Sequence, residues 1–271
     1  MDPNAIVPGP ATEIGPRGEA AARSGIVVQV EARPAVRFVA ASCSHPGLVR
    51  DNNEDAVFAG RALIAVADGV GGSVFGEVAS ARAIAAIGYL EDARPDGSLV
   101  GFGLAAFERV TASLAREVAA DSSRRGMATT LTALLASGDS LVVLHIGDSR
   151  AYRARAGEWR QLTRDDSLVQ GLVDAGALTD VEAQRHPARS VVLQALNGGP
   201  VEPHVEVFDL APGDRYLVCS DGLSDYVDGG LIARVVTTEA DVRRCCAALL
   251  EAAIEQGAPD NVSCVVADAR A

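Results

Sequence analysis

Three aspartates follow strongly apolar runs in this 271-residue chain, each beside a glycine or one residue from it. Asp68 ends the run LIAVAD, Asp148 follows LVVLHIG, and Asp221 follows YLVCS. Short apolar runs bounded by glycine predict strands buried on both faces, where an unpaired carboxylate is costly. We therefore expect the strands to deliver these carboxylates to one end of a sheet, as ligands for hard divalent cations. The alternative is that the DG and GD pairs only form turns, which is a weaker explanation for three sites than for one.

The order of the expected elements indicates an α+β sandwich with segregated helices. Strands 129–135, 141–146 and 151–155 are expected to form an antiparallel meander. Residues 165–189 predict a flap beside a site, because two short helical patterns lie there in polar surroundings. The other predicted strands are 37–42, 56–59, 63–67, 190–196, 204–210, 216–219 and 262–266, the long helices are 76–91, 103–120 and 240–256, and the short helices of the flap are 167–175 and 180–184.

Composition restricts the class of protein and its partners. The net charge is −12 and no Lys/Arg-rich run occurs, which argues against binding to nucleic acid or to an anionic membrane. The five cysteines are odd in number and lack C-x-x-C spacing, so we expect reduced core residues rather than disulfides or a zinc site. No apolar run is long enough to span a bilayer and no signal peptide is evident, so we expect a cytoplasmic protein.

Residues 1–35 predict a disordered tail, because prolines stand at positions 3, 8, 10, 16 and 34 and only residues 26–30 resemble a strand. Residues 36–271 are expected to form one domain, since no shift in composition marks a further boundary.

Eight motifs connect these features to a known family. VRDNNED, ADGVGG with GEVAS, GMATTLTALL, HIGDSRAY, LTRDDSLVQ, HPARSVVLQALNG, CSDGLSD and APDNVS occur in this order between about residues 36 and 269. In this set and order the chain resembles the metal-dependent serine/threonine phosphatases of the type 2C, or PPM, family, in particular the bacterial branch that opposes Ser/Thr kinases. The resemblance implies a central β-sandwich of two antiparallel sheets flanked by helix pairs, with a binuclear Mn2+ or Mg2+ centre at one end.

The resemblance also assigns roles to residues. Arg50 matches a phosphate-binding arginine, a role that suits its bidentate fork, and Asp55 matches a hydrogen-bond acceptor for the metal-bound water. On the residues alone, the loop that holds Arg50, Glu54 and Asp55 is as well explained by a solvated charged loop. The implied ligands of the metal pair are Asp68, the backbone carbonyl of Gly69, Asp221, Asp260 and Glu54, and those of a weaker third metal are Asp148 and Asp225.

The implied activity is hydrolysis of phosphoserine and phosphothreonine in proteins by a metal-activated water, carried out by a monomer that acts on Ser/Thr kinases and their substrates. One departure is Val70, which stands where many eukaryotic members have a histidine general acid. His145 is no substitute, because it lies within a strand at odd spacing from Asp148 and is expected in the core. The alternatives are a catalytically silent sensing or scaffold module of the same fold, and a phosphatase restricted to one small phosphoprotein.

Overall fold

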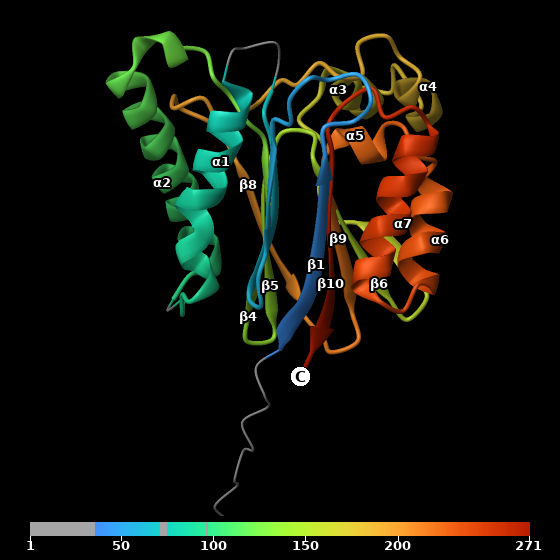
Figure 1. Ribbon diagram of the computed structural model, residues 1–271. Helices are drawn as coiled ribbons and strands as arrows, with labels where there is room; N and C mark the ends of the chain where they lie inside the picture. The colour runs from blue at the N-terminus through green and yellow to red at the C-terminus, as the bar shows by residue number, and fades with distance from the viewer. Residues whose placement is uncertain (1–35, 71–74, 96) are drawn as a thin grey trace, which may run out of the picture. The chain divides into compact units, whose positions relative to one another are not determined.

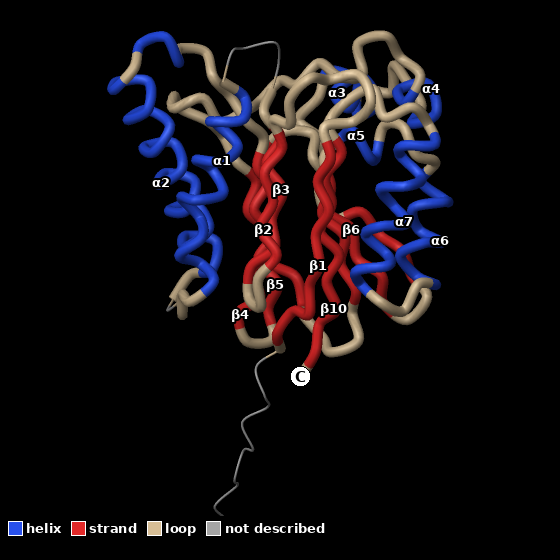
Figure 2. Tube along the Cα trace, in the orientation of Figure 1, coloured by secondary structure: helices blue, strands red, loops and turns tan. Residues whose placement is uncertain are grey.

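Two antiparallel five-stranded sheets face each other in the computed structural model, which describes residues 36–70, 75–95 and 97–271 (Figure 1). Sheet A has the strand order β1-β10-β9-β6-β7, and sheet B has the order β2-β3-β4-β5-β8. Helices α1 and α2 cover the outer face of sheet B, and α6 and α7 cover the outer face of sheet A (Figure 2). The α+β sandwich with segregated helices is therefore confirmed.

The elements have the following bounds. The strands are β1 (Arg37–His45), β2 (Asp55–Ala59), β3 (Leu63–Asp68), β4 (Leu131–Ser137), β5 (Ser140–Ile146), β6 (Arg150–Arg155), β7 (Glu158–Gln161), β8 (His204–Asp209), β9 (Arg215–Cys219) and β10 (Val262–Arg270). The α-helices are α1 (Gly76–Ile87), α2 (Leu99–Ala120), α3 (Leu168–Asp174), α4 (Asp180–Gln184), α5 (Asp221–Ser224), α6 (Gly229–Thr238) and α7 (Val242–Glu255), and the 3-10 helices are η1 (Gly88–Glu91) and η2 (Ser122–Arg124).

Strand β3 shows how the layers hold the site. Its apolar residues are fully buried, and alternate side chains serve different layers because successive residues of a strand point to opposite faces. Ile64 and Val66 pack between the sheets, whereas Ala65 and Ala67 pack beneath α1 and α2. With both faces packed, the strand has a fixed register, and this places Asp68 at its end.

The predicted meander is wrong. Strands β4 and β5 form a hairpin in sheet B, but β6 crosses to sheet A, where it pairs with β7 and β9. The crossing begins at Gly147, whose φ is +105°, a value that L side chains rarely adopt. A Cβ at this position would also lie 2.5 Å from Cγ2 of Thr130, so the turn needs glycine.

One further prediction of secondary structure is wrong, and one helix was not predicted. Residues 190–196 form no continuous strand and make only isolated bridges, Ser167 with Val192 and Thr129 with Leu196. A strand needs a continuous partner, and alternating apolar residues cannot show whether one exists. Helix α6 was missed, because it begins with Gly229 and Gly230 and is rich in β-branched residues, both of which lower helix propensity.

Some predictions fall on parts of the chain outside the described residues. These are the disordered tail over residues 1–35, its strand-like stretch at 26–30, and the glycine turn at Gly71 and Gly72. Within the described part, no helix is both long enough and apolar enough to cross a membrane.

Candidate metal centre

Carboxylates from both sheets meet at one end of the sandwich. Asp68 ends β3 and Asp148 follows β5, both in sheet B, whereas Asp221 follows β9 and Asp260 precedes β10, both in sheet A. This is the upper end in Figure 1, where α3, α4 and α5 also lie. The expectation that one sheet delivers the carboxylates is therefore wrong, because the centre is built where the ends of two sheets come together.

A cavity of about 140 Å3 opens at this end. Of the nine residues that sequence reasoning selected, seven line it, whereas Asp55 lies behind it and Asp225 borders a neighbouring cavity. The fold therefore brings residues that are up to about 200 positions apart into one site. The lining residues are Arg50, Glu54, Asp68, Gly69, Val70, Asp148, Ser190, Val192, Asp221 and Asp260.

Burial and mutual repulsion perturb these carboxylates strongly. Burial raises the pKa of Asp68 and of Asp221 well above the ordinary range, and the negative charges of neighbouring aspartates raise both further. At Asp148, burial followed by repulsion from Asp165 and Asp225 raises the pKa to about 7. Divalent cations among these groups would restore their charged forms, and an all-oxygen donor set fits hard cations such as Mn2+ and Mg2+.

Asp55 lies behind the cavity as the cross-strand partner of Asp68 in the β2–β3 pair. Its Oδ2 accepts a hydrogen bond of 2.9 Å from Oγ of Ser220. Its buried Oδ1 has no hydrogen-bond partner among the described residues. Burial raises the pKa of Asp55 to about 6, so this unpaired oxygen calls for a hydrogen-bond donor or a positive charge from the centre.

Arg50 is the cationic group in the lining of the cavity. Its Nη2 lies 2.8 Å from Oδ2 of Asp260, and half of the side chain is exposed. Hydrogen bonding and attraction to Asp260 raise the pKa of Arg50, so the guanidinium is charged. A half-exposed arginine at a cavity mouth is placed to meet an anionic substrate, because its planar fork matches the oxygens of a phosphate.

The loop that carries Glu54 is fixed by Asn261, which sequence reasoning did not single out. The buried Asn261 side chain accepts a hydrogen bond of 2.8 Å from the backbone N–H of Glu54. It also donates to the carbonyls of Pro46, at 2.9 Å, and of Asn52, at 2.8 Å. The sequence does hold a signal for this role, because Asn261 is a polar residue that directly follows Asp260 in a predicted turn at the start of a strand.

Two glycines allow the backbone to approach Glu54 closely. The N–H of Gly69 donates a hydrogen bond of 3.1 Å to the carbonyl of Glu54. A Cβ at Gly69 would lie 2.6 Å from the carbonyl carbon of Gly76, and a Cβ at Gly76 would lie 2.6 Å from Oε2 of Glu54. Any larger residue at either position would displace the start of α1 or the Glu54 carboxylate.

A second cavity, of about 290 Å3, lies beside the first and shares Asp148 with it. Asp225 lines this cavity, 3.6 Å from Nη2 of Arg150 and 3.7 Å from Nε of Arg189. Arg150 is itself held by a bidentate contact with Asp165, at 2.6 to 3.0 Å. Sequence reasoning missed these three partners, although each lies in one of the quoted motifs, HIGDSRAY, HPARSVVLQALNG and LTRDDSLVQ.

The prediction that His145 lies in the core agrees with the structure. His145 is buried, with Nδ1 2.8 Å from Oγ1 of Thr132 and Nε2 2.9 Å from the carbonyl of Arg164. It thus has the structural role that its strand position predicts. None of the described residues that line the 140 Å3 cavity is a histidine, and Val70 lies at its wall.

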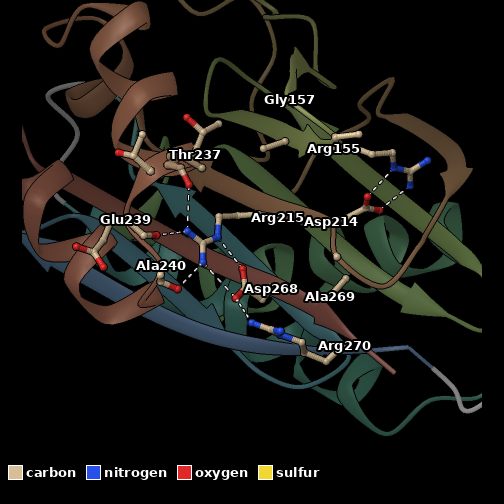
Figure 3. Close-up of a pocket in the computed structure, with 15 residues that line it drawn as sticks. Arg155, Gly157, Asp214, Arg215, Thr237, Glu239, Ala240, Asp268, Ala269 and Arg270 are labelled. Carbon is tan, nitrogen blue, oxygen red and sulfur yellow. Dashed lines mark hydrogen bonds and ion pairs between the residues drawn. The ribbon is translucent and has the colours of Figure 1, made fainter.

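A further cavity, of about 440 Å3, is a different feature (Figure 3). Its charged residues are already paired with one another. Arg215 bonds to Asp268 and to backbone carbonyls of residues 236, 239 and 240, and Arg155 bonds to Asp214. Because Asp214 and Asp268 are each paired with an arginine, this cavity lacks the group of apposed carboxylates that lines the smaller one.

The sandwich and its acidic centre are those of a metal-dependent phosphatase family. Residues 41–266 match the protein phosphatase 2C family, and the chain belongs to it. It is 47% identical over 228 residues to the serine/threonine protein phosphatase PstP of Mycobacterium tuberculosis, covering 84% of this chain and 44% of that protein. The chain therefore spans less than half the length of this relative.

Two further similarities are informative. The chain is 32% identical over 225 residues to the protein phosphatase PhpP of Streptococcus pneumoniae, covering 80% of this chain and 92% of that protein. The crystal structure of the catalytic domain of PstP, in complex with two manganese ions, matches with a TM-score of 0.81 at 44% identity. That match covers 87% of this chain and all of the other.

Proposed function

We propose that this chain is a metal-dependent protein phosphatase that hydrolyses phosphoserine and phosphothreonine in proteins. The observation that carries the proposal is the cavity of about 140 Å3, in which carboxylates from both sheets face a half-exposed arginine. The names of PstP and PhpP, and the two manganese ions of the PstP catalytic domain, support the same activity.

The donor set proposed for the metals is the one that sequence reasoning selected. When bound, a pair of divalent cations supplies Lewis-acid activation of water and neutralises charge on a phosphoryl group. Four carboxylates would roughly balance the charge of such a pair. We infer that the pair, Mn2+ or Mg2+, would be held by Asp68, the Gly69 carbonyl, Glu54, Asp221 and Asp260, and a weaker third cation by Asp148 and Asp225.

The chain's own residues bind and orient the substrate. Arg50 holds phosphoryl oxygens through its guanidinium, and to do so it exchanges its contact with Asp260 for one with the substrate. The buried oxygen of Asp55 provides a fixed hydrogen-bond acceptor behind the centre. No Ser, Cys or His nucleophile is needed.

The size of the cavity agrees with a phosphoryl group as the recognised part of the substrate. Pockets for drug-sized ligands span about 300–1,000 Å3, whereas this one is about 140 Å3. A phosphorylated side chain fits such a site while its polypeptide lies across the surface. We therefore propose phosphorylated proteins as substrates, including Ser/Thr kinases and the proteins that they modify. Monomeric state and cytoplasmic location stay predictions.

Phosphate release from a phosphothreonine peptide tests the proposal. We expect release with Mn2+, none after exhaustive chelation, and recovery when Mn2+ is returned. Asp221→Asn, purified in the same way, is the matched control, and its inactivity would exclude a contaminating phosphatase. A wild-type protein that binds Mn2+ but releases no phosphate from any phosphopeptide would favour the silent sensing or scaffold module.

A further inference from the structure

Three cysteines from distant parts of the chain meet beneath α7. Cys43 in β1 and Cys264 in β10 are direct cross-strand partners, and Cys246 reaches them from α7. Their three Sγ atoms all lie within 4.8 Å of one another. Cys246 and Cys264 are buried, whereas Cys43 is partly exposed. The expectation of reduced core cysteines did not include this cluster, because its members come from three elements and share no local spacing.

The separations suit a single cation. A metal bound to three sulfurs at about 2.3 Å in a plane sets the sulfurs about 4 Å apart, within the 4.8 Å limit found here. No other His, Cys, Asp or Glu of the described chain joins the group, so its donors are sulfur alone. Thiolates prefer soft or borderline cations such as Cu(I) and Zn(II), in contrast to the hard cations of the carboxylate centre.

We propose that Cys43, Cys246 and Cys264 form a second metal site, separate from the carboxylate centre, which binds one thiophilic d10 cation, either Cu(I) or Zn(II). Three sulfurs complete the coordination of Cu(I), and a water entering beside the partly exposed Cys43 would complete that of Zn(II). The same exposed edge gives the cation an entry path. Binding forms three metal–sulfur bonds in place of three S–H bonds, and the three protons go to solvent.

The surroundings of the cluster are those of a packed core. The Sγ of Cys246 donates a hydrogen bond of 3.2 Å to the carbonyl of Ala41 in β1, which ties α7 to the strand that carries Cys43. The surroundings are apolar, since Leu249 of α7 and Val266 of β10 belong to the same buried cluster. Packing in such surroundings holds the three side chains in place, so their sulfurs stay close enough together to meet one cation.

The strands that hold the cluster also hold part of the carboxylate centre on their other face. Successive strand residues point to opposite faces, so Ser263, next to Cys264, faces the interior of the sandwich. The N–H of Ser263 donates a hydrogen bond of 3.0 Å to Oγ of Ser220, which in turn donates one of 2.9 Å to Oδ2 of Asp55. A cation that joins α7 to β1 and β10 would therefore brace the strands behind Asp55.

Metal titration tests the site without any use of phosphatase activity. The reduced chain, with its carboxylate centre saturated by Mn2+, is titrated with Zn(II) or with Cu(I) in competition with a chromophoric chelator. We expect one equivalent of at least one cation to bind, a thiolate-to-metal charge-transfer band for Cu(I), and a higher melting temperature. Comparing the two titrations identifies the preferred cation.

Variants assign the binding to the cluster. Cys43→Ser, at the partly exposed position, and Cys246→Ser should each weaken binding by about 100-fold or more, since loss of an outer-shell partner alone costs 10–100-fold. Cys245→Ala is the matched control, because Cys245 is buried in the same helix but its Sγ contacts the carbonyl of Val235. It should bind as the wild type does.

Three results would overturn the proposal. One is that neither cation binds beyond the Mn2+ sites. Another is that Cys43→Ser and Cys246→Ser bind as tightly as Cys245→Ala. The third is that the isolated chain has lost two hydrogens to a disulfide between two of the three thiols and binds no cation after reduction. Circular dichroism of each variant confirms that it is folded.

Discussion

Arg50 and Asp260 form an ion pair, with Nη2 2.8 Å from Oδ2, although the two residues are proposed to serve different ligands. Arg50 is proposed to bind the substrate phosphate, and Asp260 is proposed to bind a metal. Metal binding at the centre and release of Arg50 from Asp260 are therefore linked, because a cation competes with the guanidinium for the same carboxylate.

Arg50→Ala should raise the KM for phosphothreonine peptides by about tenfold or more, since hydrogen bonds to charged groups contribute roughly 1.5–3 kcal/mol. The affinity for Mn2+ should stay the same or increase, because Asp260 loses a competing partner. Steady-state kinetics and Mn2+ titration measure both quantities.

Arg94→Ala is the control for this variant, since Arg94 is exposed and, among the described residues, its side chain bonds only to the carbonyls of Asp92 and Ala93. An unchanged KM in Arg50→Ala would remove Arg50 from substrate binding.

Asp148→Asn should stabilise the metal-free protein at high pH. The folded state raises the pKa of Asp148 from 3.8 to about 7, so it binds more protons than the unfolded state between these values. This group therefore lowers stability as pH rises through that window, by on the order of a few kcal/mol at pH 8. The asparagine variant lacks this loss. Urea unfolding with chelator present, at pH 5 and pH 8, measures the difference.

Saturating Mn2+ is the control for this pH series, because bound cations stabilise the charged carboxylate. With cations bound, the free energy of unfolding of the wild type should no longer fall between pH 5 and pH 8 because of Asp148. If wild type and Asp148→Asn show the same pH dependence without metal, Asp148 does not carry the shifted pKa.

The same variant should discriminate between substrates. Asp148 borders the cavities of about 140 and 290 Å3 and is only 6% exposed, so it is not a solvent-facing turn residue. If this side of the site assists the leaving alkoxide, turnover of a phosphothreonine peptide should fall more than turnover of p-nitrophenyl phosphate, whose leaving group needs little protonation. Equal losses would argue against a leaving-group role, and no loss on either substrate would exclude Asp148 from catalysis.

Asn261→Ala should loosen the loop of residues 46–54 and weaken Mn2+ binding. The change removes three hydrogen bonds and leaves the backbone N–H of Glu54 without its partner. We expect a loss of about 1–3 kcal/mol in the free energy of unfolding, the usual cost of an unsatisfied buried polar group. Chemical unfolding and Mn2+ titration measure the two effects.

Asn197→Ala provides the comparison, because Asn197 is exposed and, within the described part of the chain, its side chain bonds only to the nearby N–H of Gly199. If Asn261→Ala binds Mn2+ as tightly as the wild type does, the hydrogen bonds of Asn261 do not position Glu54.

The sequence by itself determined the family and the class of fold, and it selected the carboxylates that line the 140 Å3 cavity. These features are local: Asp68, Asp148 and Asp221 each follow an apolar run that must be buried, and the motifs around them keep their order. The apolar runs also located most strands, because alternation and burial act on neighbouring residues. Helix α6 escaped detection because its initial glycines and β-branched residues contradict its helical state, which packing against sheet A imposes.

Only the tertiary structure decided which strands share a sheet, and therefore which side chains meet. Strand β6 leaves its sequence neighbour β5 to pair with β9, and Cys43 finds Cys264 across β1 and β10. Asn261 reaches back about 200 residues to hold the loop of Glu54 in the same way. Such pairings depend on the free energy of burying whole faces together, which is a property of the assembled sandwich and leaves no periodic signal in the chain.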